Sequence, residues 1–189
     1  DSASRKDVKA YLFSPMERPL YEQKYAIDKS FMEVVGVPRH APEWMEFIRL
    51  NVLEQSNEIN SLNSGSIFII SRPGNTNYHP YERKKKALED IKRLAWNDLK
   101  KNIVVKLHPK EKNEGIYEEV FGTDTYGDKW VYSDLHPFVL GKESSFAISF
   151  YSGVPIDMLA LGVLTIEYLD LREIPEYDND ESLRDKMGH

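Results

Sequence analysis

The sequence contains no cysteine among its 189 residues. Without a thiol, the chain cannot form a disulfide scaffold, a thiolate-ligated metal site or a cysteine nucleophile. Its histidines do not supply a metal site either, because His40, His79 and His136 have no ligand-like spacing to one another. We therefore predict no metal site.

Long apolar runs and excess positive charge are also missing. No apolar run approaches the roughly 20 residues that a helix needs to cross a bilayer, and no signal peptide is evident. With 25 Lys and Arg against 31 Asp and Glu, the net charge is -6. Non-specific nucleic-acid binders have the opposite balance, so we expect no nucleic-acid partner. We predict a cytoplasmic protein without a transmembrane segment, either free or peripheral to the inner face of the membrane.

What the chain does contain is enough apolar sequence for a sizeable core, at 41% hydrophobic and 12% aromatic residues. From residue 66 onward, apolar strand patterns alternate with helical patterns. We expect strands at 67–70, 103–107, 130–132, 146–150 and 164–168, helices at 81–94, 116–121 and 154–161, and a helical turn at 137–140. This order predicts βαβ units, and hence an α/β Rossmann-like three-layer sandwich with a mainly parallel sheet.

The remaining segments flank this domain. Short strands are predicted at 11–13 and 31–35, and a helix is predicted to begin at Pro42. We interpret residues 1–40 as a linker segment, 41–175 as the Rossmann-like domain and 176–189 as a polar tail with one helical turn at 182–186.

Three polar loops follow predicted strands, and in an open α/β sheet such loops meet at one ligand-binding edge. They are 71–74, 106–110 and 149–153. His108, held by Pro109, is the candidate catalytic residue because an imidazole can donate to a phosphate oxygen. Lys106 and Lys110 make its loop electropositive, and strand alternation puts Lys106 and His108 on one side. The alternative is a histidine that only caps a turn.

The loop after the strand at 146–150 brings Tyr151, Ser152 and Gly153 to the start of a helix. A helix start offers unpaired N–H groups, and Gly153 allows a phosphate to approach the backbone. Alternatively, Ser152 is an ordinary N-cap residue. Asp157, in the helix that follows, either orients a ligand group or is solvated on the outer face.

Other polar residues near this edge carry weaker predictions. Arg72 and Asn75 are candidates for a pyrophosphate or sugar hydroxyl, against the alternative of solvated loop residues. Glu167 and Asp170 are candidates for a ribose or sugar contact. The basic run 83–86 is interpreted as a solvated helix face. Because Gly-x-Gly-x-x-Gly and Walker-type loops are absent, nicotinamide and P-loop sites lose their main support.

The stretches 106–110 (Lys-Leu-His-Pro-Lys) and 150–162 together resemble the nucleotide-binding half of GT-B glycosyltransferases. The similarity is to bacterial surface-polysaccharide enzymes: capsule Kdo transferases, sialyl- and polysialyltransferases and CDP-glycerol glycerophosphotransferases. In these families, a His-Pro pair and a later Ser-Ser or Ser-Thr pair contact the donor phosphate. His108 and Pro109 match the first motif and Ser152 matches one serine of the second. Gly153 departs from the pattern, which assigns its contact to a backbone N–H.

Two further stretches bear on this resemblance. The pair at 144–145 (Ser-Ser) competes for the serine motif, but it precedes its strand and so belongs to the wrong end of the sheet. The segment 36–39 resembles the crossover into this half in such enzymes.

The resemblance implies a donor-binding half of an inverting, metal-independent glycosyltransferase that lacks its N-terminal half. The substrate would be a CMP-, UDP- or CDP-linked sugar, with no further cofactor, and a glycan or lipid-linked acceptor would bind through the missing domain. His108 would act on the leaving phosphate. The implied donor-binding residues are Lys106, Pro109, Tyr151, Ser152, Gly153, Arg72 and Asp157. Two alternatives stay open: a nucleotide-sugar epimerase or hydrolase of the same fold, and a non-catalytic nucleotide-binding or assembly module.

Overall fold

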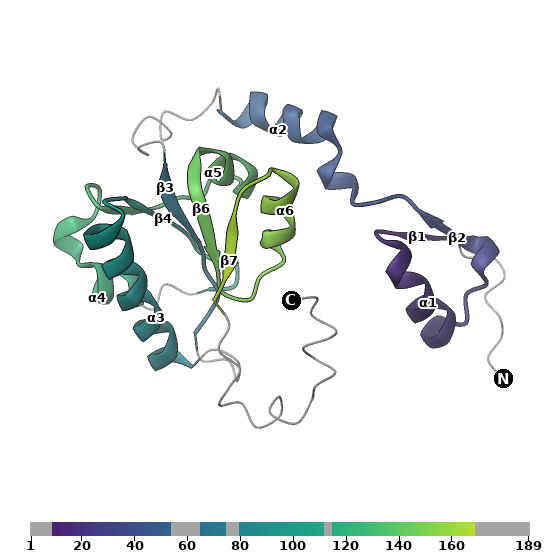
Figure 1. Cartoon of the computed structure of the whole chain (residues 1–189), viewed down its shortest axis with the longest axis horizontal. Coiled ribbons are helices and arrows are strands. Elements are labelled where there is room, and N and C mark those ends of the chain that lie inside the picture. Colours follow the sequence, from purple (N-terminus) through teal and green to yellow (C-terminus); the bar gives the residue numbers. More distant parts are fainter. Residues whose placement is uncertain (1–8, 54–64, 75–79, 112–114, 169–189) are drawn as a thin grey trace. The chain divides into compact units, whose positions relative to one another are not determined.

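The structure is a computed structural model that describes residues 9–53, 65–74, 80–111 and 115–168. The chain divides into two compact units, Asp1–Phe47 and Ile48–His189. Figure 1 shows both units as ribbons. Helix α2 (Pro42–Leu53) contains the residues at which one unit passes into the other.

The first unit is built on two short parallel strands, β1 (Ala10–Leu12) and β2 (Met32–Val34). Both strands were predicted, each within about one residue. Helix α1 (Arg18–Tyr25) between them was not predicted. Proline is tolerated in the first helical turn, and that is where Pro19 stands.

The second unit contains a five-stranded sheet in the order β5-β4-β3-β6-β7, and every neighbouring pair is parallel. This confirms the α/β fold with a parallel sheet. All of β3 is buried, as expected for the continuous apolar run at the centre of a covered sheet. The strands are β3 (Ser66–Ile70), β4 (Ile103–Lys106), β5 (Trp130–Tyr132), β6 (Ser144–Ser149) and β7 (Thr165–Glu167).

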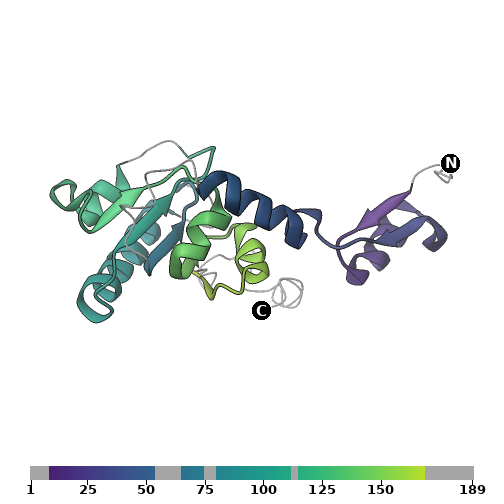
Figure 2. The same ribbon diagram turned by 90° about the horizontal axis from the view of Figure 1, so that it is seen from above.

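Helices cover both faces of this sheet, as Figures 1 and 2 show. One face packs against α3 (Tyr81–Arg93) and α4 (Ile116–Phe121), and the other against α5 (Pro137–Glu143) and α6 (Val154–Ala160). Alternate residues of β3 divide between the two cores: Ile67 and Ile69 face α3 and α4, whereas Phe68 and Ile70 face α5 and α6.

The predicted boundaries hold to within a few residues. The main difference is α5, which was expected only as a turn and extends to Glu143. Helix α3 also continues into a π-helical turn, Leu94–Asp98. The helical turn predicted at 182–186 lies outside the described residues. In the described part of the chain, no helix is both long enough and apolar enough to span a bilayer.

Two Leu→Ala substitutions test which helix faces form the core. Leu88 on α3 is 0% exposed, whereas Leu159 on α6 is 76% exposed. We expect Leu88→Ala to lower the free energy of unfolding by about 2–5 kcal/mol, because it leaves a cavity. Leu159→Ala should change it by less than about 0.5 kcal/mol. Urea denaturation followed by circular dichroism measures both, and equal losses would contradict the assigned core.

Candidate functional site

The order in which strands are added to the sheet reverses between β3 and β6. From β3 the chain passes through α3 to β4 on one side, and from β6 it passes through α6 to β7 on the other. Helices α3 and α6 lie on opposite faces. The loops that leave two such strands separate and form a crevice, which is where open α/β sheets bind ligands.

His108 and Ser152 lie at this same edge of the sheet. Their strands β4 and β6 flank β3, and Ile70 of β3 pairs in register with both Lys106 and Ser149. His108 follows two residues after Lys106, and Ser152 three residues after Ser149. Both side chains are partly exposed, so neither is sealed in the core. The structure therefore brings the two loops together, while their contact with a shared phosphate stays a prediction.

The His108 ring is fixed by its own loop. The backbone N–H of Lys110 donates to Nδ1 at 3.0 Å. A neutral ring that accepts at Nδ1 carries its proton on Nε2. His108 therefore does cap a turn, through Nδ1, as the alternative predicted. Nε2 is left as a hydrogen-bond donor for a ligand.

Arg72 connects the loop after β3 to the loop after β6. Its guanidinium donates to the carbonyl oxygen of Tyr151 and lies 4.8 Å from the centre of the Tyr151 ring. Tyr151 has a left-handed backbone with φ of 51°, which is uncommon for a residue other than glycine. Arg72 therefore stabilises the loop that carries Ser152. The other candidate of the β3 loop, Asn75, lies outside the described residues.

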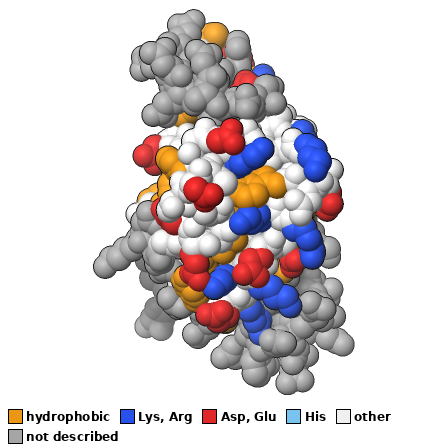
Figure 3. All heavy atoms as spheres, turned by 90° about the vertical axis from the view of Figure 1, so that its left-hand side faces the viewer, with side chains coloured by type: hydrophobic (Ala, Val, Ile, Leu, Met, Phe, Trp, Pro, Cys, Tyr) orange, Lys and Arg blue, Asp and Glu red, His pale blue; other side chains and the backbone are white. Residues whose placement is uncertain are grey.

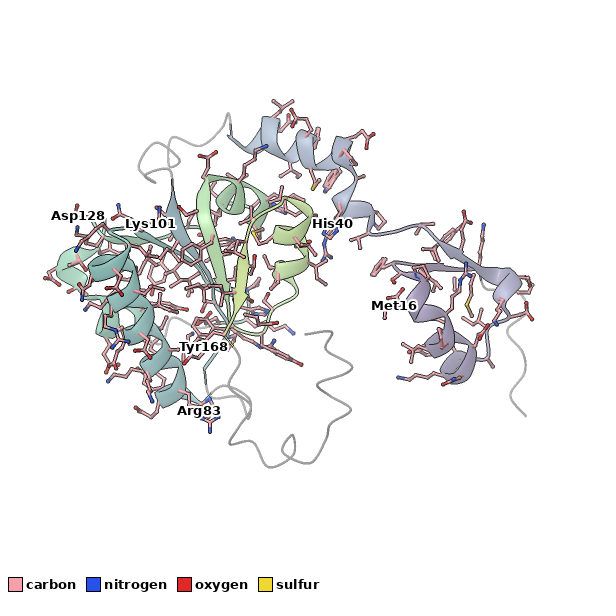
Figure 4. All side chains as sticks on the ribbon, in the orientation of Figure 1. Met16, His40, Arg83, Lys101, Asp128 and Tyr168 are labelled. Carbon is pink, nitrogen blue, oxygen red and sulfur yellow. The ribbon has the colours of Figure 1, made fainter. Side chains whose placement is uncertain are left out.

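Lys84 corrects the prediction for the basic run at 83–86. Its side chain is 0% exposed, so it does not belong to a solvated face. Arg83 instead points away from the sheet in Figure 4, and Figure 3 shows acidic and basic side chains interspersed over this outer face. The signal was present in the sequence, because Lys84 shares the i, i+4, i+7 stripe of Leu88 and Ile91, which are buried.

A buried polar cluster (Ser71, Lys84, Glu111 and Tyr117) lies behind the His108 loop. Lys84 forms an ion pair with Glu111, whose side chain is 3% exposed, and donates to the Arg72 carbonyl at 2.7 Å. Ser71 Oγ donates to Glu111 Oε1 at 2.9 Å and accepts from Lys84 at 3.2 Å and from the Tyr117 hydroxyl. Burial raises the pKa of Tyr117 well above its ordinary value, which keeps this hydroxyl a donor.

The same cluster holds the backbone at His108. Glu111 Oε2 accepts the His108 N–H at 3.1 Å while Oε1 faces Lys84 and Ser71. One carboxylate therefore links the loops after β3 and β4 to α3. The role of Glu111 was not predicted, because an acidic residue three positions after a histidine is not a recognisable motif.

The start of α6 differs slightly from its prediction. The N-cap residue is Gly153, and Ser152 precedes it, with Oγ accepting the Val154 N–H at 3.3 Å. Gly153 is exposed and has open space where a side chain would stand. Asp157 is 8% exposed, so the alternative of a solvated outer-face residue is wrong.

The structure also describes three other predicted positions, Lys106, Ser145 and Glu167. Lys106 donates to the Asp134 carbonyl at 3.0 Å, and partial burial lowers the pKa of Lys106. Ser145 donates to the Gly65 carbonyl at 2.6 Å, which confirms that the competing serine pair lies at the amino end of the sheet. Glu167 pairs in register with Ser149. Asp170 lies outside the described residues, and within the described ranges no group of three metal-ligating side chains occurs.

Comparison with solved structures places this arrangement among GT-B folds. The chain is similar to S. aureus MnaA in complex with UDP, with a TM-score of 0.57 and 14% identity over 81% of this chain and 40% of that one. It is similar to UDP-GlcNAc 2-epimerase from Methanocaldococcus jannaschii (0.56, 20%, covering 95% and 55%). It also resembles a variant of the wall teichoic acid polymerase TagF (0.52, 14%, covering 90% and 41%).

These likenesses establish the fold: the α/β unit with its parallel sheet matches half of a GT-B chain. The chain spans less than two thirds of the length of each of these proteins. They give no support to the sialyltransferase part of the resemblance. No protein-family description and no curated protein sequence matched the chain.

Two adjacent lysines test the buried polar cluster. Lys84→Met leaves the Glu111 carboxylate buried without its cation, and we expect it to lower the free energy of unfolding by about 3–5 kcal/mol. Lys85→Met is the matched control, because Lys85 pairs with Glu119 at the surface, where both side chains are partly exposed. We expect a much smaller loss for this control. Chemical denaturation compares the two, and similar stabilities would refute the role given to Lys84.

Proposed function

We propose that this chain is the donor-nucleotide-binding half of a GT-B glycosyltransferase, inverting and metal-independent, that acts in the synthesis of a surface polysaccharide or glycoconjugate. The observation that carries the proposal is the placement of His108 and Ser152 on loops that leave the two strands flanking β3, at one edge of the sheet. A ligand that lies across this edge reaches both loops. A CMP-, UDP- or CDP-linked sugar is the proposed substrate.

The two side chains suit a phosphate. His108 presents an N–H at Nε2, because Nδ1 is occupied by the Lys110 N–H. Ser152 Oγ accepts from Val154 and keeps its own proton to donate. As the nucleotide leaves, negative charge grows on its phosphate oxygens, and fixed donors at that position lower the energy of the transition state. Lys106 adds positive potential from the end of β4.

The buried polar cluster supports this chemistry indirectly. A donor stabilises a transition state well only if it is held in place before the reaction. Glu111 holds the His108 backbone, and Lys84 holds Glu111 and the Arg72 carbonyl. In such an enzyme, the other half would supply the acceptor-binding site and the catalytic base. This agrees with a chain that spans 40% and 41% of two of the similar proteins.

A second function has a specific observation in its favour. The likeness to UDP-GlcNAc 2-epimerase reaches a TM-score of 0.56 and covers 95% of this chain. An epimerase or hydrolase of nucleotide sugars would use the same phosphate contacts but different chemistry at the sugar. Incubating the complete protein with UDP-GlcNAc and analysing the sugar by NMR decides between them. An epimerised or hydrolysed product without an acceptor would favour the alternative.

The proposed phosphate contact is tested by titrating the protein with CMP, CDP, UDP and GDP by NMR or calorimetry. We expect at least one nucleotide to bind. His108→Asn should weaken it about tenfold, because asparagine can still accept the Lys110 N–H but lacks the imidazole Nε2 donor.

The matched control is His40→Asn, since His40 lies in the first unit. It should leave the affinity unchanged. The proposed function would be refuted if none of the four nucleotides perturbs resonances near His108.

A further inference from the structure

A second histidine, His136, shows the same arrangement of its ring nitrogens as His108. It lies between β5 and α5, where Nδ1 accepts the Phe138 N–H at 3.2 Å and the ring packs edge-on against Phe138 at 4.8 Å. The residue is only partly covered, so solvent still reaches it. When the ring is neutral, its proton therefore stands on Nε2, as in His108.

Lys106 connects the loops that carry the two histidines. It ends β4 two residues before His108, and its ammonium donates to the carbonyl of Asp134, which is two residues before His136. The field of Lys106 reaches the His136 ring, as does that of Asp157 on α6. The Lys106 ammonium at the end of β4 therefore lies close to the His136 loop that follows β5.

Three polar residues lie at the ends of β4, β6 and β7, on the face covered by α5 and α6. They are Lys106, Ser149 and Glu167, and Ile70 of β3 pairs in register between the first two. Ser149 is 0% exposed, and its hydroxyl has no hydrogen-bond partner among the residues that the structure describes. A buried hydroxyl without a partner is unfavourable and marks a place where a bound group can complete the structure.

We propose that His136 and Lys106 form a second anion contact, through which the phosphate of the donor nucleotide is bound from the β5 side while His108 and Ser152 bind it from the other. The contact extends the proposed function and rests on it. His136 donates from Nε2 and Lys106 supplies the charge.

The electrostatics give this contact a measurable signature. The pKa of His136 is lowered, chiefly by loss of hydration and also by the Lys106 ammonium, and the Asp157 carboxylate on α6 opposes the shift. Without a ligand, the ring therefore stays neutral to a lower pH than an ordinary histidine. A phosphate between His136 and Lys106 favours the protonated ring, so binding must raise the pKa of His136.

The first experiment uses His136→Asn, because asparagine is a good N-cap and can keep the bond from the Phe138 N–H while it removes Nε2. The probes are the nucleotide that binds the wild-type chain most tightly among CMP, CDP, UDP and GDP, and the matching nucleoside. We expect about fivefold to twentyfold weaker nucleotide binding, unchanged nucleoside binding and an unchanged midpoint of unfolding.

The second experiment follows the His136 ring of the wild-type chain by NMR over a pH series, with and without the nucleotide. We expect its pKa to rise on binding, a change that a purely structural cap would not show. Nucleotide affinity of His136→Asn within twofold of wild type, or an unchanged His136 titration, would overturn this contact while leaving the His108 result standing. A wild-type chain that binds none of the nucleotides would overturn both proposals.

Discussion

The arrangement of the candidate site depends on one buried ion pair, Lys84 with Glu111. Taking both charges out of water is costly, and the pair persists because each partner is also hydrogen-bonded. Lys84 binds the Arg72 carbonyl and Ser71, and Glu111 binds Ser71 and the His108 backbone. Two loops and a helix are therefore fixed by a contact that a less polar core would not provide. Removing one partner of such a pair is strongly destabilising, because it leaves the other charge buried without compensation.

This constraint acts together with the topology of the sheet. Parallel strands bring their loops to one edge of the sheet, and the strand order reverses between β3 and β6, which is where open α/β sheets bind ligands. Arg72 then connects the β3 loop to the left-handed Tyr151 of the β6 loop. Each of the two loops that flank β3 is therefore held by a side chain. Glu111 holds the loop after β4, and Arg72 holds the loop after β6.

The architecture could be predicted from the sequence, because apolar runs and helical periodicity are local signals. The alternation of strands and helices then predicts the parallel sheet. The sequence also placed His108 and Ser152 at one edge. The prediction was wrong for Lys84. The run of four basic residues suggested a solvated helix face, although Lys84 alone among them lies on the buried stripe of the helix. Nothing in the sequence indicated that Glu111 contacts Ser71 and Lys84, or that His136 interacts with Lys106 and Asp157, because these residues are far apart in sequence. Nucleotide binding by these side chains stays a proposal.

The shared phosphate contact is tested most directly by a crystal structure of the protein with the nucleotide that it binds. We expect one phosphate group with oxygens within about 3 Å of both His108 Nε2 and Ser152 Oγ. A nucleotide whose phosphate lies away from this edge of the sheet, or contacts only one of these two side chains, would contradict the shared contact.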